Sequence, residues 1–138
     1  MPVATSDPLA TVEHTEQEWG EAARRLIAMR AFNRRHDIVR AATYTYGELY
    51  AELTNMGLAH RKVAIPERDW MGRVLYALAV INKANREPCM GAMVVRQDTR
   101  EVSKGYAEAV HIVYGVVDLK RLEDHAAVER LKVVAMFR

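Results

Sequence analysis

Apolar residues recur at helical spacing in the N-terminal third of the chain, directly after a helix-start signal. Thr15, followed three residues later by Glu18, fits a capping box, in which the two residues satisfy each other's free backbone N–H groups. The apolar stripe that follows consists of Trp19, Ala22, Ala23, Leu26 and Ile27. This pattern predicts an amphipathic helix that begins after Thr15 and buries the stripe.

A second capping box, formed by Thr45 and Glu48, opens a shorter pattern of the same kind. The apolar face of this stretch consists of Tyr46, Leu49, Tyr50 and Leu53. Gly57 is a suitable helix stop because glycine adopts the left-handed conformation easily, and Leu58 can pack back onto the helix. We therefore predict a helix from Thr45 to Met56.

The widest apolar stripe follows a proline, which suits the first turn of a helix. The stripe consists of Trp70, Met71, Val74, Leu75, Leu78 and Ile81, broadened by Ala77 and Val80. A helix with so wide an apolar face should be the most buried one in the domain. We predict it from Pro66 to Arg86, because the residue before Pro88 disfavours the helical conformation.

The pattern after Pro88 changes from helical spacing to a short apolar run. Residues 89–95 (CMGAMVV) predict a strand, 97–100 a polar turn, and 102–104 the partner strand of a hairpin. Residues 106–114 fit a strand and a helix about equally, and Gly115 favours the helix. A last helix is expected from Leu119 to about Phe137, capped by Asp118. Its stripe consists of Leu122, Ala126, Val133 and Met136, with a second apolar edge at Val128, Leu131 and Val134.

Composition adds little to this picture. The chain has 138 residues, of which 50% are apolar and 28% charged, as expected for one domain with a core of its own. We assign that domain to residues 15–138 and read residues 1–14, which lack periodicity, as a flexible arm. The chain shows no apolar run long enough for a membrane helix and no signal peptide, so we expect a cytoplasmic protein with no membrane association.

The charge and the single cysteine limit the classes of site. A net charge of +2 and a pI near 8.8 permit a polyanionic partner without requiring one. One cysteine, Cys89, excludes an intramolecular disulfide and disfavours a thiolate metal site. Six arginines fall between Arg24 and Arg40, and they fit either a solvated helix face or a face that contacts phosphates.

The order of these elements resembles that of a known class of module. The sequence Thr45-Tyr46-Gly47-Glu48-Leu49 opens a helix, the long buried helix follows, and the strand and polar turn lead to Lys104-Gly105-Tyr106. In this respect, residues 44 to about 115 resemble the small winged-helix-like (winged helix-turn-helix) modules of bacterial and phage proteins. The resemblance implies an α+β, mostly α fold: a winged-helix-like three-helix core, a short β-hairpin and a C-terminal helix. It also implies DNA binding, although winged helices serve as protein–protein modules too.

On this interpretation the cations divide into three groups. The long helix would present Arg68, Arg73 and Lys83 to a groove of double-stranded DNA. The hairpin tip would bring Arg96, Arg100 and Lys104 to phosphates or the minor groove. Arg61 and Lys62 in the connector would add phosphate contacts.

We find no signal for an enzyme, a metal or a cofactor. The sequence holds no P-loop, dinucleotide fingerprint, HExxH or CxxC motif. The histidines are dispersed: His14, His36, His60, His111 and His125. His36 and His60, each beside arginines, are the best candidates for the general base of a metal-independent ribonuclease. Two hypotheses stand ahead of that one: a non-enzymatic nucleic-acid-binding regulator or accessory factor, and a protein-binding adaptor, inhibitor or immunity-type module that associates through its apolar C-terminal helix.

Overall fold

The computed structural model describes residues 15–58, 67–115 and 119–138. These residues are mostly helical and include one small two-stranded parallel sheet, which confirms the expected α+β, mostly α class. The expected N-terminal arm and Asp118 lie outside the described residues, as does the connector expected from Leu58 to Ile65 except for Leu58 itself. In chain order the elements are α2 (Glu16–Asn33), η1 (Val39–Ala42), β1 (Tyr44–Thr45), α3 (Tyr46–Asn55), α4 (Glu67–Ala84), η2 (Met90–Met93), β2 (Val94–Val95), α5 (Lys104–Tyr114), η3 (Leu119–Arg121) and α6 (Leu122–Ala135).

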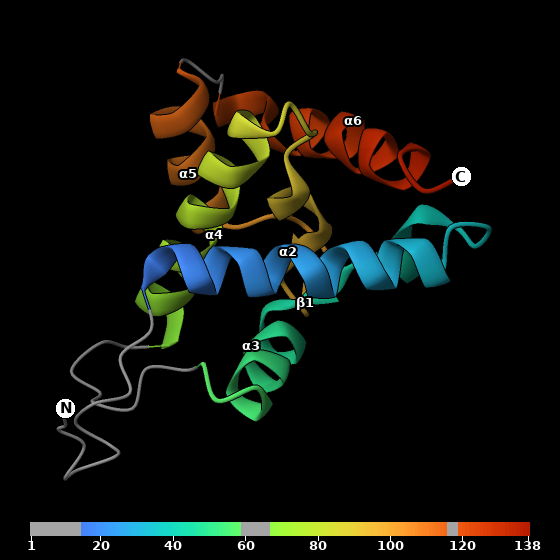
Figure 1. Ribbon diagram of the computed structural model, residues 1–138. Helices are drawn as coiled ribbons and strands as arrows, with labels where there is room; N and C mark the ends of the chain where they lie inside the picture. The colour runs from blue at the N-terminus through green and yellow to red at the C-terminus, as the bar shows by residue number, and fades with distance from the viewer. Residues whose placement is uncertain (1–14, 59–66, 116–118) are drawn as a thin grey trace, which may run out of the picture.

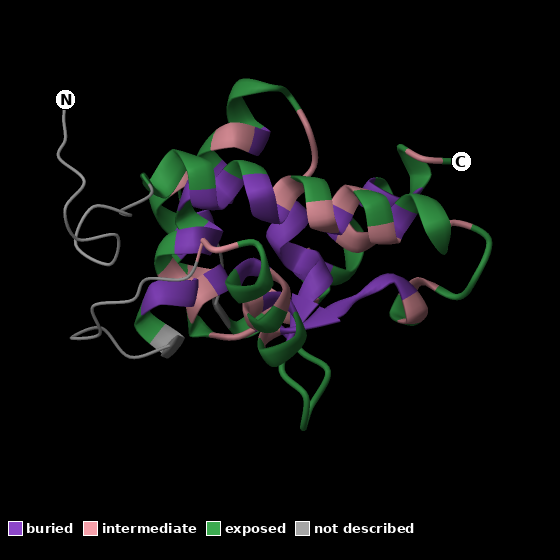
Figure 2. Cartoon of the chain, turned by 60° about the horizontal axis from the view of Figure 1, so that its bottom comes forward, coloured by how far each residue is buried: buried purple, intermediate pink, exposed green. Residues whose placement is uncertain are grey.

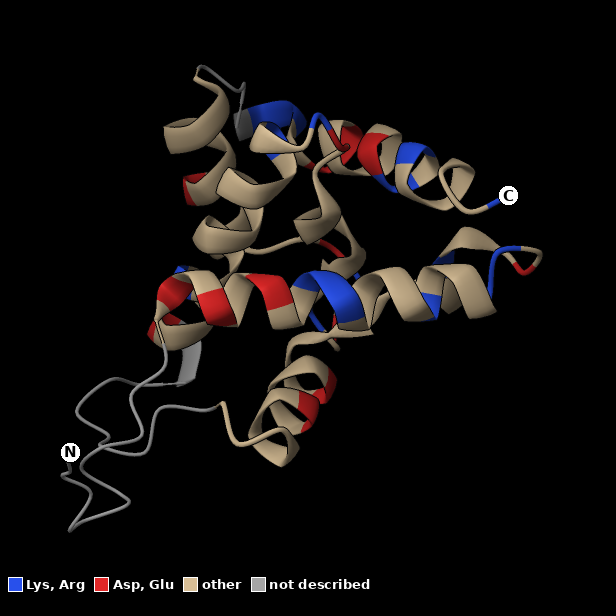
Figure 3. Cartoon of the chain, in the orientation of Figure 1, with Lys and Arg blue, Asp and Glu red and all other residues tan. Residues whose placement is uncertain are grey.

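Both predicted capping boxes are present. The Thr15 hydroxyl accepts a hydrogen bond from the Glu18 N–H, and the Glu18 carboxylate accepts one from the Thr15 N–H. Thr45 and Glu48 do the same at the start of α3. Acidic residues precede basic ones along α2, as the helix dipole favours (Figure 3). These local signals place the starts of both helices correctly.

Helix α4 lies between α2 and α5, with α3 on the other side of α2 in the view of Figure 1. Its buried side chains include most of the predicted stripe: Trp70, Met71, Val74, Leu75 and Leu78. Trp70 packs edge-on against Trp19 of α2, with ring centroids 5.4 Å apart, and against Tyr50 of α3 at 5.6 Å. The prediction that this helix is the most buried one is confirmed among the described helices, although Val80, expected to broaden the stripe, is exposed.

The predicted β-hairpin is wrong. Strand β2 pairs in parallel with β1, placing Tyr44 opposite Val94 and Thr45 opposite Val95, and both strands are buried (Figure 2). The expected partner strand at 102–104 does not form, because Ser103 caps a helix that already begins at Lys104. Helices α3 and α4 provide the crossover that a parallel pair requires. Of the two alternatives for residues 106–114, the helix is confirmed as part of α5.

The C-terminal helix is confirmed in its central part. Ala126 and Val133 of the predicted stripe are fully buried, as is Val134 of the second edge. The rest of that edge, Val128 and Leu131, remains exposed at 51% and 59%. Helix α6 therefore closes the core with one face and presents apolar side chains to solvent with another.

Candidate functional site

A cleft with a volume of about 1050 Å³ lies between α4, the first turns of α5 and the loop after β2. Three cations from these three segments line it: Arg73 of α4, Arg96 of the loop and Lys104 at the start of α5. Two carboxylates line it as well, Asp69 and Glu108. The remaining lining consists of Tyr46, Met71, Gly72, Tyr76, Ser103, Gly105 and Ile112.

Part of the cleft lining comes from the starts of two helices, α3 and α5. The Ser103 hydroxyl caps α5 by accepting a hydrogen bond from the Gly105 N–H at 3.3 Å. The hydroxyl of Tyr46, the first residue of α3, lies 2.5 Å from the same Ser103 oxygen. This contact joins the first residue of α3 to the N-cap residue of α5, so both helices begin beside the cleft.

Helices α4 and α5 contact each other at this end of the cleft. A Cβ atom added to Gly105 would lie 3.5 Å from the Gly72 Cα atom and 3.4 Å from a Leu75 methyl group. Farther along, the Lys83 ammonium group donates a hydrogen bond of 2.9 Å to the Val113 carbonyl. These two contacts show that the helices run in the same direction along the cleft.

The loop that carries Arg96 is exposed and internally hydrogen-bonded. The Arg96 N–H donates to the Glu101 carbonyl at 2.8 Å, and the Arg100 N–H donates to the Arg96 carbonyl at 2.9 Å. Arg100 has a φ of +60°, a left-handed conformation that turns the chain back toward α5. We refer to residues 96–101 as the cation loop.

Two of the three cleft cations form ion pairs with exposed carboxylates. Arg96 donates hydrogen bonds to Asp98, and this contact lowers the pKa of the Asp98 carboxyl group. The Lys104 ammonium group lies 3.8 Å from Glu108, and its side chain is 86% exposed. Exposed ion pairs of this kind contribute little stability, so either cation can exchange its partner for a ligand phosphate at small cost.

The structure brings some of the predicted site residues together and separates others. Arg73, Arg96 and Lys104 share the cleft, whereas Arg100 lines a second hollow of about 440 Å³ beside Arg40 and Arg130. Arg68 lies in the first turn of α4, and its side chain falls outside the described part. The cations at positions 61 and 62 lie in the connector, also outside it.

Two tyrosines of the cleft were missed from the sequence as site residues. Tyr46 packs against the core, as predicted for the apolar face of its helix, and its hydroxyl also joins α3 to α5. Tyr76 is 37% exposed and lies one turn from Arg73 on the cleft side of α4. The exposed polar edge of α4 offered a signal for Tyr76, because an aromatic residue there interrupts a row of charged positions.

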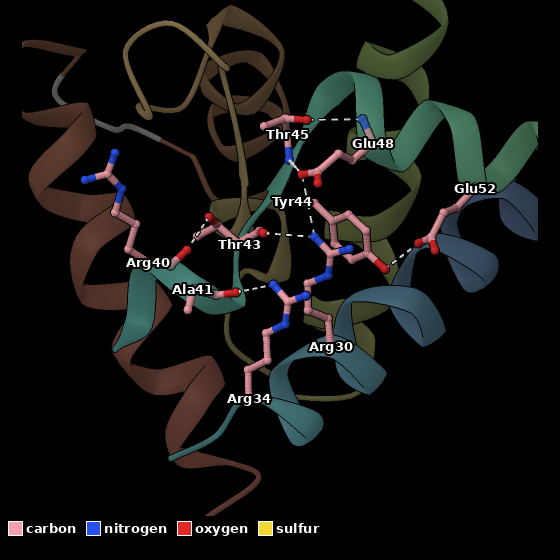
Figure 4. Close-up of polar contacts among 9 residues, drawn as sticks. All are labelled: Arg30, Arg34, Arg40, Ala41, Thr43, Tyr44, Thr45, Glu48 and Glu52. Atoms are coloured by element: carbon pink, nitrogen blue, oxygen red, sulfur yellow. Dashed lines mark hydrogen bonds and ion pairs between the residues drawn. The ribbon is translucent and has the colours of Figure 1, made fainter. Parts of the chain in front are cut away.

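Arg30 of α2 and Arg34, the residue that ends this helix, donate hydrogen bonds to the segment before β1, and Arg34 remains exposed (Figure 4). The Arg30 guanidinium lies 3.5 Å from the centre of the Tyr44 ring and donates to the Thr43 carbonyl at 3.2 Å. Arg34 donates to the Ala41 carbonyl at 2.6 Å. These contacts fasten the segment before β1 to α2, and they account for part of the basic run without a phosphate.

A second polar cluster fixes the segment that leads to η2. Arg24 of α2 forms an ion pair and hydrogen bonds with Glu87, and this contact lowers the pKa of the Glu87 carboxyl group. The fully buried Asn82 donates to Glu87 at 3.1 Å and accepts from the Met90 N–H at 3.0 Å. The cluster therefore has a structural role, which accounts for the presence of Arg24 in α2 without a ligand.

None of the described histidine and cysteine side chains lines the cleft. His36 is exposed beside the end of α2, and His125 is hydrogen-bonded through Nδ1 to the Tyr106 hydroxyl at 2.8 Å. Burial raises the pKa of the Cys89 thiol to about 12, so the thiol stays protonated. In residues 15–58, 67–115 and 119–138, no three His, Cys, Asp or Glu side chains are grouped to hold a metal ion.

Comparisons with models of protein families, with curated proteins and with solved structures found no match to this chain. None of the helices in the described ranges is both long enough and apolar enough to cross a membrane.

Proposed function

We propose that the protein binds nucleic acid, and that the cleft between α4, α5 and the cation loop contacts the phosphate backbone. The observation that carries the proposal is the convergence of Arg73, Arg96 and Lys104 from three separate segments on one cleft. With three cations against two carboxylates, the described lining has a net charge of +1. The starts of α3 and α5, where helix dipoles are positive, lie beside the same cleft.

The proposal does not depend on a winged-helix arrangement. In a winged helix, α4 would be the helix presented to a duplex groove, and the hairpin would be the wing. Here α4 is covered by α2 and α5 along most of its length, and β2 pairs with β1. The cation loop is the feature that corresponds best to the predicted wing, because it is exposed and carries Arg96 and Arg100.

Binding should be modest and depend on salt. Each neutralised phosphate contributes a slope of roughly −0.7 to −0.9 to the log–log dependence of the association constant on salt. Three cleft cations therefore predict a slope of about −2 to −3. Non-specific affinities at physiological salt usually fall in the range of roughly 10⁻⁴–10⁻⁶ M.

Fluorescence anisotropy with labelled DNA at low salt tests this function. We expect micromolar binding by the native protein and a large loss in the double variant Arg96→Ala/Lys104→Ala. Arg25→Ala is the matched control, because Arg25 is an exposed cation of α2 that does not line the cleft. Thermal unfolding of each variant verifies that it folds. An absence of binding at low salt, or an equal loss in the Arg25 control, would contradict the proposal.

A second candidate function is supported by the exposed apolar face of α6. Val128 and Leu131 lie one turn apart and expose more than half of their surfaces, as does Ile38 near the end of α2. A surface of this kind fits a protein partner or a second copy of the chain. Light scattering after size exclusion separates these cases: a dimer that Leu131→Glu dissociates would support self-association, and a monomer at high concentration would exclude it.

A further inference from the structure

The two ends of the cleft differ in chemistry. Arg96 and Lys104 stand where α5 begins, and Ile112 lies two turns farther along, at about 12 Å for a rise of 1.5 Å per residue. Ile112 is 63% exposed and Tyr76 is 37% exposed, and both line the same cleft. One end therefore suits an anion, and the remainder offers an aromatic ring and an aliphatic side chain.

Double-stranded DNA would contact only the cationic end of such a cleft. In double-stranded DNA the bases are stacked inside and the outer surface consists of sugars and phosphates, so phosphates could reach Arg96 and Lys104 while Tyr76 would meet no base. A single strand can turn its bases outward and stack them on an aromatic side chain. The arrangement of cations beside an exposed ring is the combination that single-strand-binding surfaces use.

One of the two carboxylates of the cleft, Glu108, agrees with the same assignment. Glu108 lies one turn after Lys104, and its side chain is 62% exposed. A carboxylate repels a phosphate, yet it accepts hydrogen bonds from the amino group of a base such as cytosine. Bases placed along the Glu108 side of the cleft, with phosphates at the Arg96 end, give Glu108, Arg96 and Lys104 suitable partners. The second carboxylate of the cleft, Asp69, is not part of this assignment.

We infer that the cleft binds a single-stranded nucleic acid in preference to a duplex, with phosphates at Arg96 and Lys104 and a base stacked on Tyr76. This inference rests on the proposed function. It assigns Tyr76 as a binding residue. It also predicts that this one side chain determines the preference for single-stranded over double-stranded nucleic acid.

The experiment compares three labelled ligands of about a dozen nucleotides with the full-length protein in anisotropy titrations at low salt. They are a single strand, the same sequence as a duplex, and an abasic strand that keeps the phosphates without the bases. Each is titrated with the native protein, Tyr76→Ala, Tyr76→Phe and Val80→Ala. Val80 is the control because it is an exposed residue of α4, one turn from Tyr76, that does not line the cleft.

We expect the single strand to bind at least about fivefold more tightly than the duplex, as the loss of one base-stacking contact implies. Tyr76→Ala should remove that advantage without weakening the duplex or the abasic strand, whereas Tyr76→Phe and Val80→Ala should retain it. Equal or tighter duplex binding, or an equal effect of Tyr76→Ala on the abasic strand, overturns the inference and leaves phosphate binding intact. Failure of all three ligands to bind overturns the proposed function itself.

Discussion

Replacing Gly20 by alanine should destabilise the protein, although alanine is the better helix former. Gly20 lies in α2 where this helix crosses α4, and a Cβ atom there would lie 2.9 Å from the backbone carbon and the Cβ atom of Ala77 and 2.9 Å from a methyl group of Ile81. A backbone atom cannot rotate away, so the two helices must separate. Overpacking of this kind costs about 1–3 kcal/mol of folding stability. Because the Ala77 backbone cannot move aside, we expect a cost near the upper end of this range.

Gly72→Ala in α4 is the matched control, because a Cβ atom there meets no atom within 4 Å. Both substitutions gain about 1 kcal/mol of helix propensity. The expected net effects are thus a loss of about 2 kcal/mol for Gly20→Ala and a gain of about 1 kcal/mol for Gly72→Ala. Urea unfolding of the two variants and the native protein measures the free energies. A stability of Gly20→Ala equal to that of Gly72→Ala would refute the close crossing of α2 and α4.

Three further predictions concern stability. Arg86→Gly should stabilise the protein by about 0.5–1 kcal/mol in urea unfolding, because Arg86 has a φ of +56° directly after α4 and glycine adopts that conformation freely; a loss would contradict the left-handed helix end. Asn82→Ala should cost about 2–4 kcal/mol in the same assay, because it leaves the buried Met90 N–H without its acceptor and opens a cavity. The third prediction concerns pH. The Arg24 contact holds the pKa of Glu87 below its ordinary value of 4.5, so the contact stabilises the fold above that pH and is lost as the pH falls through the folded pKa. The free energies of unfolding of the native protein and Glu87→Gln should therefore differ at neutral pH and converge as the pH falls through the lowered folded-state pKa of Glu87, and a constant difference would contradict this origin.

The sequence was sufficient to predict the features that depend on neighbours along the chain. The capping boxes at Thr15 and Thr45 and the wide apolar stripe of α4 are local patterns, and the structure confirms them. The pairing of β2 was not predictable in this way. Two-residue strands carry almost no alternation, so the choice between a neighbouring hairpin and the distant β1 depends on how α3 and α4 pack.

The candidate site was predicted only in part, for a similar reason. Arg96 and Lys104 were selected as tips of one hairpin, and they reach the same cleft by another route, through a loop and a capped helix. Arg73 joins them because α4 and α5 approach closely. Tyr76 was missed although it interrupts a row of charged positions, because that signal does not tell which edge of α4 remains uncovered after α2 and α5 have packed against it.

The central claim is that the cleft binds the phosphate backbone, and the salt dependence of binding tests it most directly. The association constant of the protein for a single strand is measured over a series of salt concentrations, together with those of Arg96→Ala/Lys104→Ala and Arg25→Ala. We predict a log–log slope of about −2 for the native protein and the Arg25 variant, reduced in magnitude by about 1.4 in the double variant. A slope that is unchanged by the loss of both cleft cations would contradict the claim.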